Sequence, residues 1–172
     1  MMQMLEAGGM PILIDDIRKS DENNPFGYYE YEKVKTMKED TSWLGECEGK
    51  ALKIISALLY HLPGDREYKI IFMERILEEI LASQEVMLDS VLGKKLAQND
   101  RATAKHFQEH LDRVKDWLAK QRNIHTIYVN YGEAVQNPFE ISSQVARFIG
   151  GRLQTEKMAN AVRQSLYRSR SV

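Results

Sequence analysis

Residues 68 to 84 read Tyr-Lys-Ile-Ile-Phe-Met-Glu-Arg-Ile-Leu-Glu-Glu-Ile-Leu-Ala-Ser-Gln, and this stretch decides the fold. Its first half has the apolar character of a strand that is buried on both faces, as in a parallel sheet. The pattern then changes to that of a helix. The stretch therefore predicts a strand that runs directly into a helix, with Arg75 at the junction.

Arg75 and Ser83 in this stretch are the first candidates for a binding site. An Arg at the carboxyl edge of a parallel sheet lies where open α/β sheets bind their ligands. Ser83 would lie about 80° around the following helix from Arg75 and about 12 Å along it. We therefore expect the two side chains to flank one anion, with a guanidinium fork and a hydroxyl as donors. The alternative is that both are ordinary surface residues.

Apolar segments on either side continue an alternation of strands and helices. Strands are predicted over residues 11–14, 51–55, 70–72 and 124–129. Helices are predicted over residues 1–7, 28–37, 104–118, 137–148 and 155–166. The polar residues 15–27 are predicted to form a loop that lines a site. This order predicts an α/β fold with three layers, in which a mainly parallel sheet is covered by helices on both faces.

Length and composition limit the class of protein. A chain of 172 residues, 43% of them hydrophobic, is predicted to form one domain over residues 1–172. The net charge of −1 gives no basic field for nucleic acid, and no apolar run approaches the roughly 20 residues that cross a bilayer. The single cysteine, Cys47, excludes an intrachain disulfide and a multi-cysteine zinc site. We therefore expect a cytoplasmic protein with a small-molecule partner and no nucleic-acid or membrane partner.

Several groups of residues occur in one order along nearly the whole chain. They are Met1 to Gly9, Asn24-Pro25-Phe26-Gly27-Tyr28-Tyr29-Glu30, Arg75 with Ser83, Tyr128-Val129-Asn130-Tyr131 through Asn137-Pro138 to Phe148-Ile149-Gly150, and Ser165-Leu166-Tyr167-Arg168. Their order and spacing resemble the sulfotransferases, especially the bacterial sulfotransferase-like proteins of the P-loop class. The resemblance implies a P-loop NTPase-like fold that transfers a sulfuryl group from 3′-phosphoadenosine 5′-phosphosulfate to a hydroxyl or amine acceptor, without a metal.

The resemblance also implies which residues bind the donor. Arg75 and Ser83 match the Arg and Ser with which the family holds the donor's 3′-phosphate. Arg163, Arg168 and Arg170 lie where basic residues near the family's carboxyl terminus reach this phosphate, although a solvated basic tail is the favoured interpretation. A dianionic phosphate suits an Arg fork and a hydroxyl.

The candidate catalytic residues are Glu30 and Lys53. In many sulfotransferases a His follows a Lys at the end of the strand that aligns here, but Lys53 is followed by Ile54-Ile55-Ser56. Some bacterial members use a Glu, and Glu30 ends the Gly-Tyr-Tyr-Glu segment, so it is the candidate base, with Lys53 in contact with the transferring group. The alternatives are that Glu30 is an ordinary first-turn glutamate of a helix, and that His61, several residues late, is the base.

One element of the family pattern is absent from the sequence. Sulfotransferases place a phosphate-binding loop, similar to Gly-x-Pro-Arg-Ser-Gly-Thr-Ser, ahead of the helix that here begins at Met1. Neither this pattern nor Gly-x-x-x-x-Gly-Lys-[Ser/Thr] occurs in the chain. Such a loop would cradle the 5′-phosphosulfate and stabilise charge on the transferred group. The sequence therefore predicts an N-terminally truncated member of the family whose catalysis is impaired.

Two further interpretations belong to other classes. His106-Phe-Gln-Glu109-His110 matches the His-x-x-Glu-His pattern of inverted zinc peptidases, although no clear third ligand is present. The other interpretation is a noncatalytic remnant that binds a nucleotide or a partner. A missing strand would expose an edge of its sheet and favour a homodimer.

Overall fold

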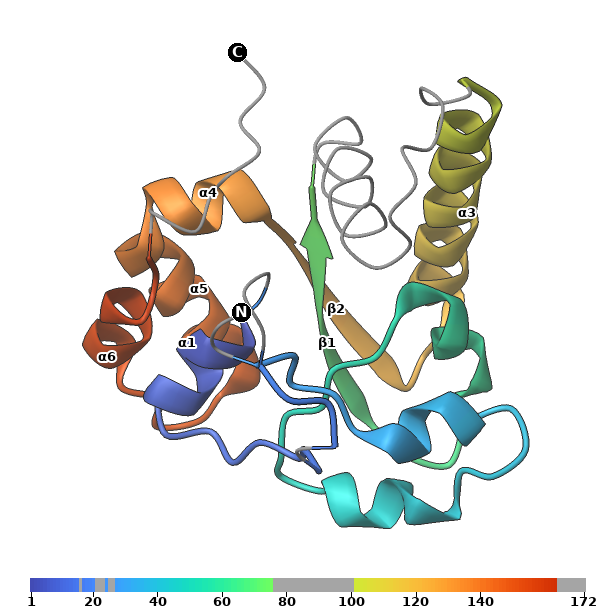
Figure 1. Cartoon of the computed structure of the whole chain (residues 1–172), viewed down its shortest axis with the longest axis horizontal. Helices are drawn as coiled ribbons and strands as arrows, with labels where there is room; N and C mark the ends of the chain where they lie inside the picture. Colours follow the sequence, from blue (N-terminus) through green and yellow to red (C-terminus); the bar gives the residue numbers. More distant parts are fainter. Residues whose placement is uncertain (16, 21–23, 25–26, 76–100, 164–172) are drawn as a thin grey trace.

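The computed structural model describes residues 1–15, 17–20, 24, 27–75 and 101–163 (Figure 1). Its α-helices are α1 (Met2–Ala7), α3 (Arg101–Lys120), α4 (Tyr131–Gln136), α5 (Pro138–Ile149) and α6 (Thr155–Asn160). Its strands are β1 (Tyr68–Glu74) and β2 (Ile124–Asn130), and its 3-10 helices are η1 (Glu32–Thr36), η2 (Ser42–Cys47) and η3 (Ser56–His61). No helix in these ranges combines the length and the apolar character needed to span a membrane.

The two strands form a parallel sheet. They pair from Tyr68 opposite Ile124 to Glu74 opposite Asn130. Parallel neighbours need a long crossover connection, and α3 belongs to that connection here. The strands predicted over residues 70–72 and 124–129 are therefore confirmed, and so is the α/β class. The carboxyl ends of both strands lie at the same edge of the sheet.

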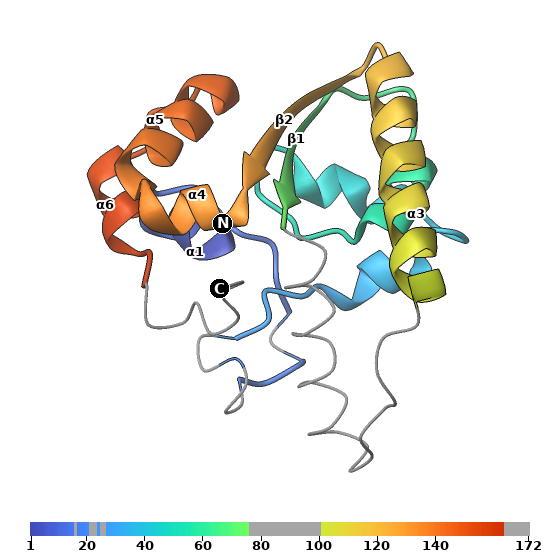
Figure 2. The ribbon, with the colours of Figure 1, turned by 90° about the horizontal axis from the view of Figure 1, so that it is seen from above.

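Helices pack against both faces of this sheet because successive strand side chains point to opposite sides. On one face Phe72 and Ile124 are buried with Val114 of α3. On the other face Val129 is buried with Val145 of α5 and Met158 of α6. Figure 2 shows α3 on one side of the strands and α1, α4, α5 and α6 on the other.

The strands predicted over residues 11–14 and 51–55 are reduced to one parallel bridge between Ile12 and Ala51. Leu13 N–H donates to the Ala51 carbonyl at 2.9 Å, and Ala51 N–H donates to the Pro11 carbonyl at 2.8 Å. Pro11 has no N–H with which to extend this ladder. Among the described residues the sheet thus has two strands, which is narrower than predicted.

The helix predicted over residues 28–37 is wrong at its start and is replaced by a short 3-10 helix over residues 32–36. Tyr29 has a φ of 52°, in the left-handed region, and the backbone of Tyr31 is extended. Helical geometry begins only at Glu32, and the resulting η1 is a single short 3-10 helix. Residues 28–31 are therefore not helical, and Glu30 lies two residues before the first residue of η1.

Candidate functional site

Arg75 lies at the carboxyl edge of the sheet, directly after the last residue of β1. Its guanidinium carbon lies 4.9 Å from the centre of the Tyr131 ring, which opens α4 directly after β2. A favourable cation–π contact between Arg75 and Tyr131 therefore connects the carboxyl end of β1 to that of β2. Ser83 and Arg168 lie outside the described residues, so the predicted pairing of Arg75 with Ser83 stays a prediction.

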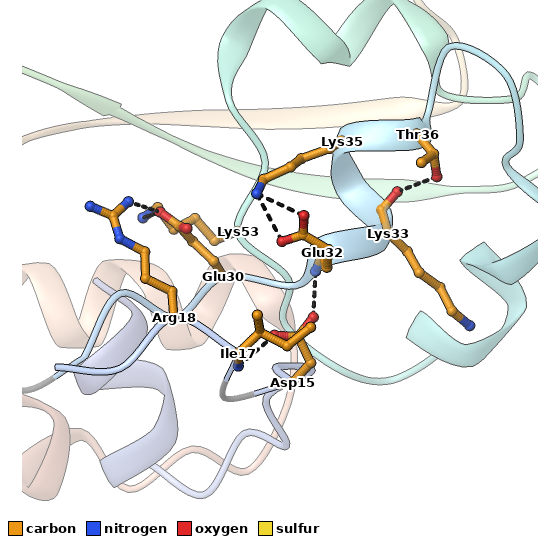
Figure 3. Close-up of polar contacts among 9 residues, drawn as sticks. All are labelled: Asp15, Ile17, Arg18, Glu30, Glu32, Lys33, Lys35, Thr36 and Lys53. Carbon is orange, nitrogen blue, oxygen red and sulfur yellow. Dashed lines mark hydrogen bonds and ion pairs between the residues drawn. The ribbon is translucent and has the colours of Figure 1, made fainter.

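Glu30 and Lys53, which are distant in sequence, come together in the structure. The Lys53 ammonium lies 3.6 Å from Oε1 of Glu30. The bridge between Ile12 and Ala51 brings the residues that follow each partner, Asp15 and Lys53, close together. Asp15 N–H donates to the Glu30 carbonyl at 3.4 Å, and this bond holds Glu30 near Lys53. The two residues predicted as catalytic candidates thus form an ion pair in the folded protein (Figure 3).

Arg18 joins this pair, and sequence reasoning missed it. Its guanidinium donates to Oε1 of Glu30 at 3.1 Å and lies over the Tyr28 ring, 3.4 Å from the ring centre. Lys53 also donates to the main-chain carbonyl of Tyr28 at 2.9 Å. One carboxylate therefore faces two cations, and Tyr28 contacts both cations. The only sequence signal was the expectation that the loop over residues 15–27 lines a site.

The neighbouring carboxylates have other partners, as Figure 3 shows. Asp15 accepts the main-chain N–H groups of Glu32 and Ile17, and the Glu32 bond is the main reason that the Asp15 pKa is lowered. Glu32 accepts two bonds of 2.8 Å from Lys35, and these raise the pKa of Lys35. The Asp15 contact therefore fixes the backbone at Glu32, two residues after Glu30.

Tyr29 ties the segment that carries Glu30 to α1. Its hydroxyl donates to Oε2 of Glu6 at 2.6 Å. Burial, followed by the hydrogen bond and charge of Glu6, raises the Tyr29 pKa to about 12. The phenol therefore stays protonated at neutral pH and acts as a donor to Glu6, which gives it a structural role.

The zinc-peptidase motif does not converge in the structure. His110 Nε2 lies 2.9 Å from the Ser56 hydroxyl, while the side chain of His106 is 79% exposed and lies 3.8 Å from Glu109. Within the ranges that the structure describes, no three His, Cys, Asp or Glu side chains are grouped to hold a metal ion. His110 instead links α3 to the first residue of η3.

The arrangement around Glu30 suits two kinds of chemistry. A carboxylate can accept a proton from a hydroxyl, and an Arg beside a Lys can bind an oxyanion. The side chains are open to solvent, with exposed fractions of 46% for Arg18, 41% for Lys53 and 31% for Glu30. No protein-family model matches the sequence, and comparisons with curated proteins and with solved structures gave no match.

Proposed function

We propose that this chain is a sulfotransferase-like protein that binds 3′-phosphoadenosine 5′-phosphosulfate and presents Glu30 and Lys53 to the reaction. The observation that carries the proposal is the 3.6 Å contact between Glu30 and Lys53, two residues that the family resemblance selected separately. The position of Arg75 at the end of β1 supports it, because parallel sheets bind ligands at this edge. The proposal includes a P-loop-like, three-layer fold.

In the proposed reaction an acceptor hydroxyl or amine attacks the sulfur of the donor. A new bond forms between the acceptor and sulfur, and the bond from sulfur to the bridging phosphate oxygen breaks. The nucleotide leaves as 3′-phosphoadenosine 5′-phosphate, and the Glu30 carboxylate takes the acceptor proton. Lys53 lies beside Glu30 and would stabilise charge on the transferred group.

Residues 1–172 do not contain the phosphate-binding loop of the family pattern. Loss of two charge-assisted hydrogen bonds, at roughly 1.5 to 3 kcal/mol each, corresponds to about two to four orders of magnitude in affinity. We expect residues 1–172 to retain nucleotide binding through Arg75 better than they retain turnover, because such a loop would also stabilise charge on the transferred group. The candidates Ser83 and Arg168 would act at the nucleotide end of the site.

Nucleotide binding is tested by calorimetric titration with 3′-phosphoadenosine 5′-phosphate. Arg75→Gln should weaken binding about tenfold or more, because the nucleotide loses a charge-assisted bond. Arg66→Gln is the matched control, since Arg66 is exposed and precedes the amino end of β1. Equal affinities for both variants, or no binding by the wild type, would contradict the proposal.

Turnover is tested with a radiolabelled sulfuryl donor and a panel of phenols, alcohols and amines. Glu30→Gln should remove the sulfuryl transfer that the wild type shows. Glu32→Gln is the control: in the wild type the Glu32 carboxylate binds Lys35, so its loss should leave the transfer rate unchanged. Nucleotide binding that depends on Arg75, without any transfer, would identify the noncatalytic remnant instead.

A further inference from the structure

We propose that Arg18 and Lys53 form a binding site for an oxyanion, which the carboxylate of Glu30 occupies as an internal ligand. Glu30 Oε1 accepts from Arg18 at 3.1 Å and lies 3.6 Å from the Lys53 ammonium. Both cations thus converge on the same carboxylate oxygen (Figure 3). An oxyanion from solution that replaced this carboxylate would meet two charged donors at once.

The two cations are held in place by contacts that do not involve Glu30. The Arg18 guanidinium lies 3.4 Å from the centre of the Tyr28 ring, and Lys53 donates to the Tyr28 carbonyl at 2.9 Å. If Glu30 turns away, Tyr28 therefore still positions both side chains. A site whose donors are held before the ligand arrives avoids much of the entropy loss of binding.

The remaining carboxylates of this cluster do not compete for the pair. Asp15 is bonded to the main-chain N–H groups of Glu32 and Ile17, and Glu32 is bonded to Lys35. Within the cluster that Figure 3 draws, Glu30 is thus the carboxylate that contacts Arg18 and Lys53. Removal of its charge would leave two adjacent cations facing solvent.

The ligand is defined by the chemistry of its present occupant. The occupant is a carboxylate oxygen, so the site suits sulfate, phosphate or a carboxylate, whether as a free ion or on a larger molecule. Exposed ion pairs are weak and are screened by salt, so the Glu30 carboxylate is a weak internal ligand of the two cations. The site shares Glu30 and Lys53 with the proposed reaction but does not include Arg75, and anion binding to it does not require sulfuryl transfer.

The experiment measures sulfate binding by calorimetry, with sodium chloride at equal ionic strength as the reference. Glu30→Gln should bind sulfate about tenfold more tightly than the wild type, because the internal competitor has lost its charge. The gain should disappear when Arg18→Gln or Lys53→Gln is combined with Glu30→Gln. Glu32→Gln, which removes a neighbouring carboxylate of comparable exposure, should bind like the wild type. Phosphate and acetate titrations then define which oxyanion is preferred.

Two results would overturn the site: an equal response of Glu30→Gln and Glu32→Gln, or a gain in affinity that survives the loss of Arg18. If Glu30→Gln does not fold, sulfate is titrated into the wild type and followed by amide chemical shifts. The amides of Arg18 and Glu30 should shift in the wild type and in Lys35→Gln but not in Arg18→Gln, and any other pattern contradicts the site. Sulfate binding that requires Arg18, alongside no binding of 3′-phosphoadenosine 5′-phosphate, would support this site and contradict the proposed function.

Discussion

Tyr29 combines an unusual backbone conformation with an unusual side-chain environment. Its φ of 52° is disfavoured for a residue with a β carbon, and its hydroxyl donates to Glu6 at 2.6 Å. The side-chain bond to α1 helps to offset the backbone strain. Because Glu30 is the next residue, the position of the candidate base depends on the anchoring of Tyr29.

Tyr29→Phe should lower the free energy of unfolding at neutral pH by about 1 kcal/mol, because one hydrogen bond is lost. The Tyr29 pKa is raised in the folded protein from its ordinary 10.0 to about 12. The folded state therefore holds this proton more tightly, and the associated stability is complete below pH 10 and lost as pH rises towards 12. The difference between wild type and Tyr29→Phe, measured by urea unfolding, should shrink over that range.

Glu6→Gln is the companion variant for this prediction. This variant removes the charge of the acceptor and leaves the burial of the Tyr29 ring unchanged. Its free energy of unfolding should therefore keep part, but not all, of the pH dependence that the wild type shows between pH 10 and 12. An unfolding free energy of Tyr29→Phe that falls as steeply with pH as that of the wild type would refute the assignment.

At this scale the sequence indicated some members of the site and not others. Glu30 and Lys53 match a family pattern, Arg75 ends a predicted strand of a parallel sheet, and the structure brings Glu30 and Lys53 into contact. Arg18 was not selected, since a lone Arg in a polar loop carries no local signal. Its partners, the Tyr28 ring and the Glu30 carboxylate, come near it only when the loop folds back.

Among the elements, α5 shows most directly how sequence sets a helix. Pro138 occupies the first turn, where its missing N–H is not needed, and Gly150 ends the helix in the left-handed conformation with a φ of 73°. Lys69 of β1 donates to the Ile149 carbonyl at 2.7 Å, which satisfies an acceptor of the last turn. Local chemistry thus sets both ends of the helix, and a long-range bond from β1 adds to its carboxyl end.

Gly150→Ala should destabilise the protein by about 1 kcal/mol, because alanine is strained at a positive φ. Gly151→Ala is the matched control. Its φ is not positive, and an added β carbon would meet Ile149 at an ordinary contact distance of 3.7 Å. Thermal unfolding of the two variants should therefore show a lower melting temperature for Gly150→Ala alone. Equal melting temperatures would argue against the role of the left-handed cap.

Elements with strong periodicity were predicted best. The helix expected over residues 104–118 is α3, and the one expected over residues 137–148 is α5, shifted by a single residue. The helix predicted over residues 28–37 begins late, at Glu32, because long-range contacts outweigh helix propensity over residues 28–31. Asp15 accepts the Glu32 N–H, and the bond from Tyr29 to Glu6 ties the residues before η1 to α1. No local pattern in the sequence reports such contacts.

For the whole molecule, the packing of α1 against α6 joins the two ends of the described fold. Gln154 N–H donates to the Gly8 carbonyl at 3.0 Å, and Met158 is fully buried against Met4 and Leu5. Gly8 permits this close approach, since a β carbon there would lie 2.5 Å from Cγ of Met158. The core on this face of the sheet therefore includes residues from both ends of the chain.

Gly8→Ala should destabilise the protein by about 1 to 3 kcal/mol, because the added methyl group forces the buried Met158 side chain to move. Gly64→Ala, where an added β carbon meets no atom within 4 Å, is the control and should change stability little. Denaturant unfolding would measure both values. A Gly8→Ala protein as stable as Gly64→Ala would show that α1 and α6 are not tightly packed.

The contact between α1 and α6 also bears on how the protein forms in the cell. As the ribosome synthesises the chain, α1 emerges before every other described element, and its partner α6 emerges after all of them. Met4 and Leu5 stay uncovered until then, which exposes apolar surface to aggregation or to chaperones. Because contacts between distant parts of a chain form slowly, we expect the docking of α1 to be a late step in folding.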